Sequence, residues 1–150
     1  MKVTSIICIL FLFSCMGACV QEKSSQKITI EDLSYSDTIE FIMPADTLYS
    51  RDIFLTINHA IDYEYENVYF KILFEKEKEM KEEVRSFALS NNLGYWIGKC
   101  GGNSCLSKYL LYKAIPPGEQ FAVKFIQYSR NETLSGVHSL SISSKILRTR

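Results

Sequence analysis

Two cysteines with a glycine-rich turn between them, Cys100 and Cys105, form the most evident chemical motif of the sequence. Two thiols could bind zinc, but a structural zinc site takes four ligands, and both histidines lie far away in the sequence. A catalytic dithiol more often has two intervening residues. Because thiols outside the cytoplasm tend to oxidise, we expect a disulfide bond between Cys100 and Cys105, with free thiols as the main alternative and no bound metal.

A second polar group runs from His59 to Asn67 and includes Asp62, Glu64 and Glu66. These side chains could form a cation site or an acid–base pair. The chain contains no nucleophile-elbow motif, phosphate-binding loop or zinc-protease motif that would accompany such a site. We therefore favour a structured connection between strands, in which Asp and Asn hydrogen-bond to the backbone and tyrosines pack at the rim. We expect no catalytic residue and no cofactor.

The N-terminus carries the pattern of an export signal. Lys2 precedes about ten apolar residues, a run that is too short for a bilayer span of roughly 20 residues. Two tetrapeptides that end at Cys15 and Cys19 then resemble the lipobox of bacterial lipoproteins, in which a cysteine thiol accepts a diacylglyceryl group. We favour Cys15 as the lipidated residue, with Cys19 as the alternative.

This interpretation divides the chain into a signal peptide, a tether and one domain. The signal peptide comprises residues 1–14, or 1–18 if Cys19 is lipidated, and residues 15–27 form a flexible tether. A lipid anchor holds a protein on a membrane without spanning it, so the first expected partner is the membrane itself. Neither cysteine is followed by the Asp that retains lipoproteins at the inner membrane, which favours the outer membrane.

Length and composition indicate one globular domain. A chain of 150 residues fits a single domain, and its 47% apolar and 23% charged residues exclude a disordered, highly charged segment. Seventeen basic residues balance seventeen acidic ones, so we expect no nucleic-acid partner, because binding to phosphates depends on clustered positive charge. The 9 Tyr, 9 Phe and many Ile residues, with little Ala, favour strands over helices.

Short apolar runs separated by turn residues predict the fold. The clearest run places Ile53, Leu55 and Ile57 on one face with a period of two. We expect an all-β domain over residues 28–150, an antiparallel β-sandwich of Ig-like or jelly-roll-like type with about eight or nine strands. The predicted strands are 27–33, 38–43, 53–59, 68–74, 83–89, 95–98, 108–112, 120–128 and 138–142. The mixed-charge run 75–83 is expected to be an exposed hairpin tip or a single helical turn.

Three stretches together resemble the gliding-motility lipoprotein GldH family of Bacteroidetes. The segment from His59 to Tyr69 is similar to that family's His-x-x-Asp-Tyr-x-Tyr-x-Asn-Leu, and Gly94 to Gly98 is similar to Gly-x-Trp-Leu-Gly. The third stretch combines Pro117-Gly118 with Gln127 to Arg130 and Leu134 to Val137, and it looks like a Pro-Gly turn, Gln-x-x-Arg and Leu-x-Gly-Ile. The sequence departs from the family in its Cys100–Cys105 loop, where we would expect a polar segment.

The resemblance implies a lipid-anchored β-sandwich in the cell envelope with a non-catalytic, accessory role in the gliding apparatus. In gliding species that apparatus is tied to the secretion of surface adhesins, so the implied partners are other envelope proteins of this machinery. The candidate interaction residues are the polar and aromatic positions of these stretches: His59, Asp62, Tyr63, Tyr65, Asn67, Trp96, Gln127 and Arg130. Two alternatives stay open: a carbohydrate-binding module that uses exposed aromatic rings, and a small hydrolase that uses Asp62 or Glu64 with His59.

Overall fold

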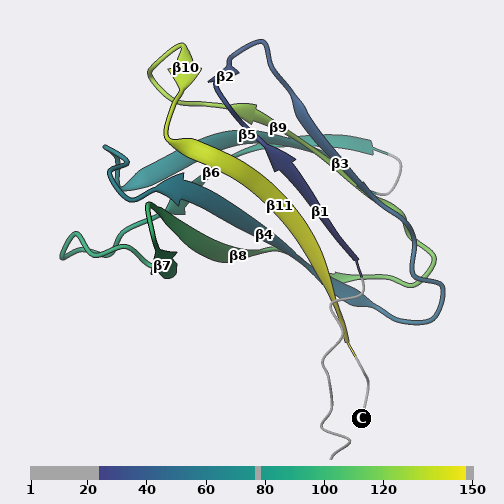
Figure 1. Cartoon of the computed structure of the whole chain (residues 1–150). Coiled ribbons are helices and arrows are strands. Elements are labelled where there is room, and N and C mark those ends of the chain that lie inside the picture. The colour runs from purple at the N-terminus through teal and green to yellow at the C-terminus, as the bar shows by residue number, and fades with distance from the viewer. Residues whose placement is uncertain (1–23, 77–78, 148–150) are drawn as a thin grey trace, which may run out of the picture.

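A computed structural model describes residues 24–76 and 79–147 of the chain (Figure 1). The described residues fold into antiparallel strands with no helix, and the all-β prediction is confirmed. The strands are β1 (Ser24–Thr29), β2 (Leu33–Ser34), β3 (Ile39–Met43), β4 (Arg51–Ala60), β5 (Asn67–Lys76), β6 (Glu79–Ala88), β7 (Lys99–Gly101), β8 (Ser104–Ile115), β9 (Phe121–Gln127), β10 (Thr133–Leu134) and β11 (Val137–Ile146). Within these residues no helix is available that could cross a membrane.

Two sheets pack face to face. One has the strand order β1-β11-β4-β8-β7 and the other the order β3-β9-β5-β6, while β2 and β10 pair separately at one end. Period-two alternation determines which side chains enter the space between the sheets. Every second residue of β4 and of β9 is buried, starting at Arg51 and at Phe121. The observed arrangement is therefore the sandwich that the alternation predicts.

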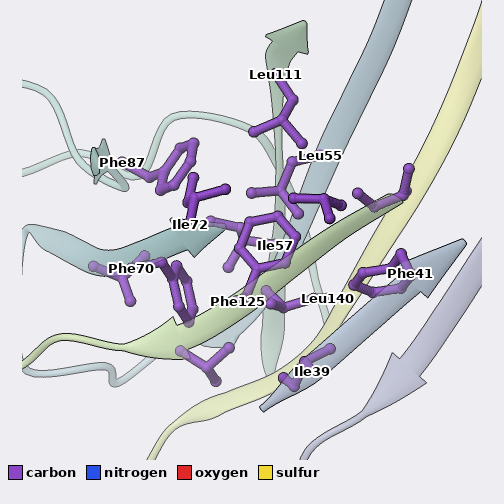
Figure 2. Close-up of a cluster of buried hydrophobic side chains, with 14 of the residues drawn as sticks. Ile39, Phe41, Leu55, Ile57, Phe70, Ile72, Phe87, Leu111, Phe125 and Leu140 are labelled. Carbon is purple, nitrogen blue, oxygen red and sulfur yellow. The ribbon is translucent and has the colours of Figure 1, made fainter. Parts of the chain in front are cut away.

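Aromatic and aliphatic side chains fill the core between the sheets (Figure 2). Phe125 contacts Phe41 and Phe70 edge to face, with ring centroids 6.0 and 5.7 Å apart. Ile57 and Leu140 come from the opposite sheet and are fully buried. Each such side chain contributes roughly 1.5–3 kcal/mol when it leaves water, so this core holds the loops at both ends of the strands in fixed positions.

Side chains also join the two sheets along the edges of the sandwich. The Gln26 side-chain amide, on β1, donates to the Ile42 carbonyl at 2.7 Å and accepts from the Ile42 N–H at 3.2 Å. On the other side, Arg85 of β6 donates to the Leu111 carbonyl of β8 at 2.9 Å. These contacts occupy backbone groups that an edge strand would otherwise leave unpaired.

The structure differs from the sequence prediction in three places. The described residues form eleven strands, because the short strands β2, β7 and β10 carry little apolar pattern and were not predicted separately. Residues 95–98 do not form a strand: Trp96 makes only an isolated bridge to Ser90, and Gly98 has a φ of +140°. Strand β1 begins at Ser24, inside the expected tether of residues 15–27, because β11 supplies a pairing partner for this polar segment.

Two further predictions concern the charged run and the N-terminus. Strand β5 ends at Lys76 and strand β6 begins at Glu79. The run 75–83 therefore belongs to the hairpin of these two strands rather than to a helical turn. The signal peptide and both candidate lipidation sites, Cys15 and Cys19, lie outside the described residues.

Candidate functional site: a groove at one end of the sandwich

The loop between β4 and β5, residues 61–66, is held by backbone contacts on three sides. At its start, the Ala60 N–H donates to the Gly136 carbonyl at 2.8 Å. Next to it, the Ile61 N–H donates to the Asn103 carbonyl at 3.0 Å. At its end, the Glu66 carbonyl accepts from the Leu89 N–H at 2.7 Å. The loop is therefore fixed by three segments that are remote from it in the sequence.

An aromatic cluster supports this loop from below. His59 is fully buried, and its ring centroid lies 4.8 Å from that of Trp96 and 5.9 Å from that of Tyr63. The Trp96 indole N–H donates to the Ile61 carbonyl at 3.0 Å, which ties the loop after β6 to the loop after β4. Tyr63 in turn contacts Tyr65 edge to face at 5.7 Å. The cluster thus links the sheet core to the surface rings of the loop.

The imidazole of His59 is buried in its neutral form. Its Nδ1 lies 2.9 Å from the Ala60 carbonyl oxygen, which can only accept, so Nδ1 carries the hydrogen. Its Nε2 is buried and has no hydrogen-bond partner among the described residues. Burial lowers the pKa of His59 below its ordinary 6.5; the Ala60 carbonyl opposes this shift, and His138 adds to it. This histidine therefore acts as a packing group at neutral pH.

Tyr63 forms the inner wall of the site, and the position of its ring requires a glycine at the adjacent turn. Gly136 has a φ of +79°, and a Cβ at this position would lie 2.8 Å from the Tyr63 ring. Only glycine therefore allows the turn between β10 and β11 to approach the ring so closely. Burial raises the pKa of Tyr63 to about 12, with a further contribution from Tyr65, so its hydroxyl stays protonated at neutral pH.

The buried Gln127 amide organises the second loop of the site, residues 128–132. Its Nε2 donates to the carbonyls of Asn131 and Glu132 at 3.1 and 3.0 Å. Its Oε1 accepts from the Ser129 N–H at 2.9 Å and from the Ser129 hydroxyl at 2.6 Å. Because one side chain satisfies four groups, the end of β9 determines the shape of the whole loop.

Between these two loops lies an open groove of about 970 Å³. Asn131 Nδ2 donates to the Tyr65 hydroxyl at 2.9 Å and connects the two walls. Three of the lining tyrosines are 43–52% exposed: Tyr65, Tyr69 and Tyr128. The groove is lined by residues 63–69 and by Tyr128, Ser129, Arg130, Asn131, Thr133, Leu134 and Ser135. It combines aromatic faces, both signs of charge and amide groups, a mixture suited to reversible recognition.

The predicted disulfide motif lies beside this end of the sandwich. Cys100 and Cys105 are bonded across the β7–β8 hairpin, with Cα atoms 4.0 Å apart. Asn103 at the hairpin tip supplies the carbonyl that holds Ile61. The hairpin therefore serves as one of the supports of the loop 61–66. Among the described residues, no cluster of three or more His, Cys, Asp and Glu side chains could hold a metal ion.

The structure brings together some of the predicted site residues and separates others. Four line the groove: Tyr63, Tyr65, Asn67 and Arg130. His59 and Gln127 are 0% and 1% exposed, so each positions a groove loop and neither can contact a partner directly. Asp62 is exposed and Trp96 half-buried, and both lie outside the groove.

Sequence reasoning missed Tyr69, Tyr128 and Asn131 as groove residues. Tyr69 lies between buried Val68 and Phe70. The period-two pattern could have indicated its outward direction, but not what lies opposite. Tyr128 reaches the same groove because its N–H donates to the Tyr69 carbonyl at 3.0 Å, a contact between strands far apart in the sequence.

The fold and the groove define a β-sandwich domain with an open groove between loops that a rigid scaffold holds. Residues 20–143 match the family model of the GldH lipoproteins, and the chain belongs to the GldH lipoprotein family. It is thus a gliding-motility-associated lipoprotein that is anchored to a membrane in the cell envelope. No curated protein matches the chain.

Proposed function

We propose that this chain is a non-catalytic accessory component of the gliding machinery and its associated secretion system, and that it binds another envelope protein in the groove. A lipid on Cys15, or alternatively on Cys19, anchors it, and the outer membrane is the favoured location. The observation that supports binding best is the groove itself, in which Tyr65, Tyr69 and Tyr128 present exposed rings between two braced loops.

The chemistry of the groove supports a protein partner. Tyr and Arg residues are enriched in protein interfaces, because they combine a large contact area with a polar tip. Arg130 lies in the wall formed by the second loop, and Glu64 and Glu66 lie in the wall formed by the first. A partner segment with both charge signs and an apolar anchor would complement this arrangement.

The state of His59 supports a non-catalytic role. An acid–base pair with Asp62 or Glu64 would need an accessible imidazole within hydrogen-bond reach of the carboxylate. His59 instead is fully buried, gives its Nδ1 hydrogen to a backbone carbonyl and packs against Trp96. Asp62 and Glu64 are exposed on the loop.

Cross-linking in the native host followed by pull-down tests the partner proposal. Wild-type protein should recover specific envelope proteins, whereas Tyr128→Ala and Arg130→Glu should recover much less of them. Tyr95→Ala is the matched control, because Tyr95 is 68% exposed but lies outside the groove. Deletion of the gene should impair motility or secretion. Recovery of the lipoprotein alone, or equal recovery by all variants, would contradict the proposal.

Carbohydrate binding is the second candidate function. The observation in its favour is the same row of exposed rings, since tyrosine faces next to amide and carboxylate groups also suit sugar stacking. A glycan array probed with wild-type protein and Tyr128→Ala separates the two candidates. Binding of one glycan class that is lost in Tyr128→Ala would favour the sugar, and an empty array would favour the protein partner.

The lipid anchor has its own test. Metabolic labelling with a fatty-acid analogue should modify the wild-type protein and Cys19→Ser, but not Cys15→Ser. The reverse result would move the anchor to Cys19. Mass spectrometry of the purified protein that found an unmodified Met1 terminus would contradict lipidation altogether.

A further inference from the structure

The N-terminal chain enters the sandwich at the end that lies opposite the groove. The N-terminal chain enters at Ser24, which pairs with Ser144 near the end of β11. The next β11 residues, Lys145 and Ile146, pair with Asp52 and Arg51 at the start of β4. The groove lies at the other ends of β4 and β11, because its first loop follows β4 and its lining residues 133–135 lead into β11. Figure 1 shows β1 starting at the end of the molecule that lies away from β10.

The loop between β3 and β4, residues 44–50, lies at this N-terminal entry end. The Ser50 carbonyl accepts from the Leu147 N–H at 2.8 Å, which places the loop beside the end of β11. Its tip carries two adjacent apolar side chains: Leu48 is 71% exposed and Tyr49 is 43% exposed. The loop therefore places an aliphatic and an amphipathic side chain next to the point where the N-terminal chain enters the domain.

A buried carboxylate keeps this tip in one shape. Asp46 is only 8% exposed, and its Oδ1 accepts from the N–H groups of Leu48 and Tyr49 at 3.0 and 3.1 Å. Its backbone carbonyl also accepts from the Gly118 N–H at 2.6 Å. The Asp46 carboxylate is thus shielded from solvent, and its hydrogen bonds fix the backbone from which Leu48 and Tyr49 project.

We propose that this tip contacts the lipid bilayer, so that the domain stands on its 44–50 loop and presents the groove away from the membrane. The proposal rests on the lipid anchor of the proposed function. Ser24 is the ninth residue after Cys15 and the fifth after Cys19. Even when fully extended, the nine residues from Cys15 and the five residues from Cys19 span only about 30 and 17 Å, respectively. The entry end is therefore the near end, and the lipid surface is the occupant that the tether brings to it.

The tether also explains how so small a tip can suffice. A Leu and a Tyr would bind a membrane weakly by themselves, but anchoring makes their insertion an intramolecular step. Tyrosine suits this position because its ring lies in the interface while its hydroxyl stays hydrated. β4 has ten residues, so the groove stands about 30 Å from the membrane-contacting end. A partner would then be met in the aqueous compartment rather than at the headgroups.

Fluorescence quenching by brominated lipids tests this orientation on the full lipidated chain. The chain has one tryptophan, Trp96, which is half-buried at the groove end. Leu48→Trp and Leu93→Trp each add a second one, at exposed positions on opposite ends; Leu93 is 80% exposed. Each protein is reconstituted in phosphatidylcholine vesicles with and without brominated acyl chains.

We expect bromine to remove much of the emission that Leu48→Trp adds and to leave Leu93→Trp and the wild type unchanged. Equal quenching of both variants, or of neither, would overturn the orientation while the lipid anchor stands. A blue shift of Leu48→Trp that is insensitive to bromine would mean that a second protein copy covers the tip, and would also overturn it. Failure of the wild type to float with vesicles would contradict the anchor, and the orientation would fall with it.

Discussion

The imidazole of His59 lies edge-on to the indole of Trp96, with ring centroids 4.8 Å apart and the planes inclined by 63°. His59 lies one residue before the end of β4, whereas Trp96 lies in the loop after β6. Their contact anchors that loop to the sheet, and the Trp96 indole N–H then holds the Ile61 carbonyl.

The stability of the domain should depend on the protonation of His59. Burial lowers its pKa below the ordinary 6.5, so the folded protein binds fewer protons there than the unfolded chain in mildly acidic solution. This contribution to the free energy of unfolding is fully present above the ordinary pKa and is lost as the pH falls toward the lowered one. Each unit of pKa difference corresponds to about 1.4 kcal/mol.

Urea unfolding between about pH 8 and about pH 5 measures this effect. His59→Phe keeps an aromatic ring in the cluster but cannot take up a proton, so the acid-side loss should be smaller in this variant. Carboxylate titrations are common to both proteins and cancel in the comparison. Identical pH dependence in the two proteins would show that His59 titrates normally.

Gly136→Ala should destabilise the domain more than Gly118→Ala. Both glycines have nearly the same φ, +79° and +80°, so both variants incur the same backbone strain, roughly 1–2 kcal/mol. Only at position 136 does the new Cβ meet a ring, at 2.8 Å from Tyr63, whereas nothing lies within 4 Å at position 118. Chemical denaturation should show a further loss of about 1–3 kcal/mol for Gly136→Ala. Equal losses would mean that Tyr63 moves away without cost.

Gln127→Leu should loosen the second groove loop while the sandwich stays folded. The substitution removes four hydrogen bonds to the loop. The Ser129 hydroxyl still donates to the Asn131 carbonyl at 3.0 Å, whereas the Glu132 carbonyl and the Ser129 N–H lose the amide that they contact. We expect a loss of about 1–3 kcal/mol and faster amide hydrogen exchange at residues 129–132. Asn131→Ala is the control, because it removes only the exposed contact to Tyr65. Unchanged exchange in Gln127→Leu would contradict the organising role of this amide.

Loss of the Cys100–Cys105 disulfide should cost about 2 kcal/mol, because the closed loop is short and constrains the unfolded chain little. Non-reducing peptide mapping should first find the two residues linked. Reduction should then destabilise the wild type and leave the double variant Cys100→Ser, Cys105→Ala unaffected. Two free thiols in the untreated protein would refute the bond.

The sequence by itself was sufficient to predict the class of fold and several local features. Alternation with a period of two is a local property, so residues 53–59 and 120–128 indicate their strands and their buried faces without knowledge of a partner. The Cys100–Cys105 pairing could be predicted for a similar reason, since a Gly-rich turn of four residues brings the two thiols together. The family resemblance also rested on local motifs.

Only the tertiary structure decided which loops meet and which polar residues face solvent. Phe70 of β5 pairs with Gln127 of β9, and this long-range register places loops 61–66 and 128–132 side by side as the walls of one groove. His59 and Gln127 are polar residues at strand ends, so their types favour an exposed site, yet the packing of distant segments buries both. Local pattern carries no information on contacts between residues so far apart in the chain, and here those contacts form the site.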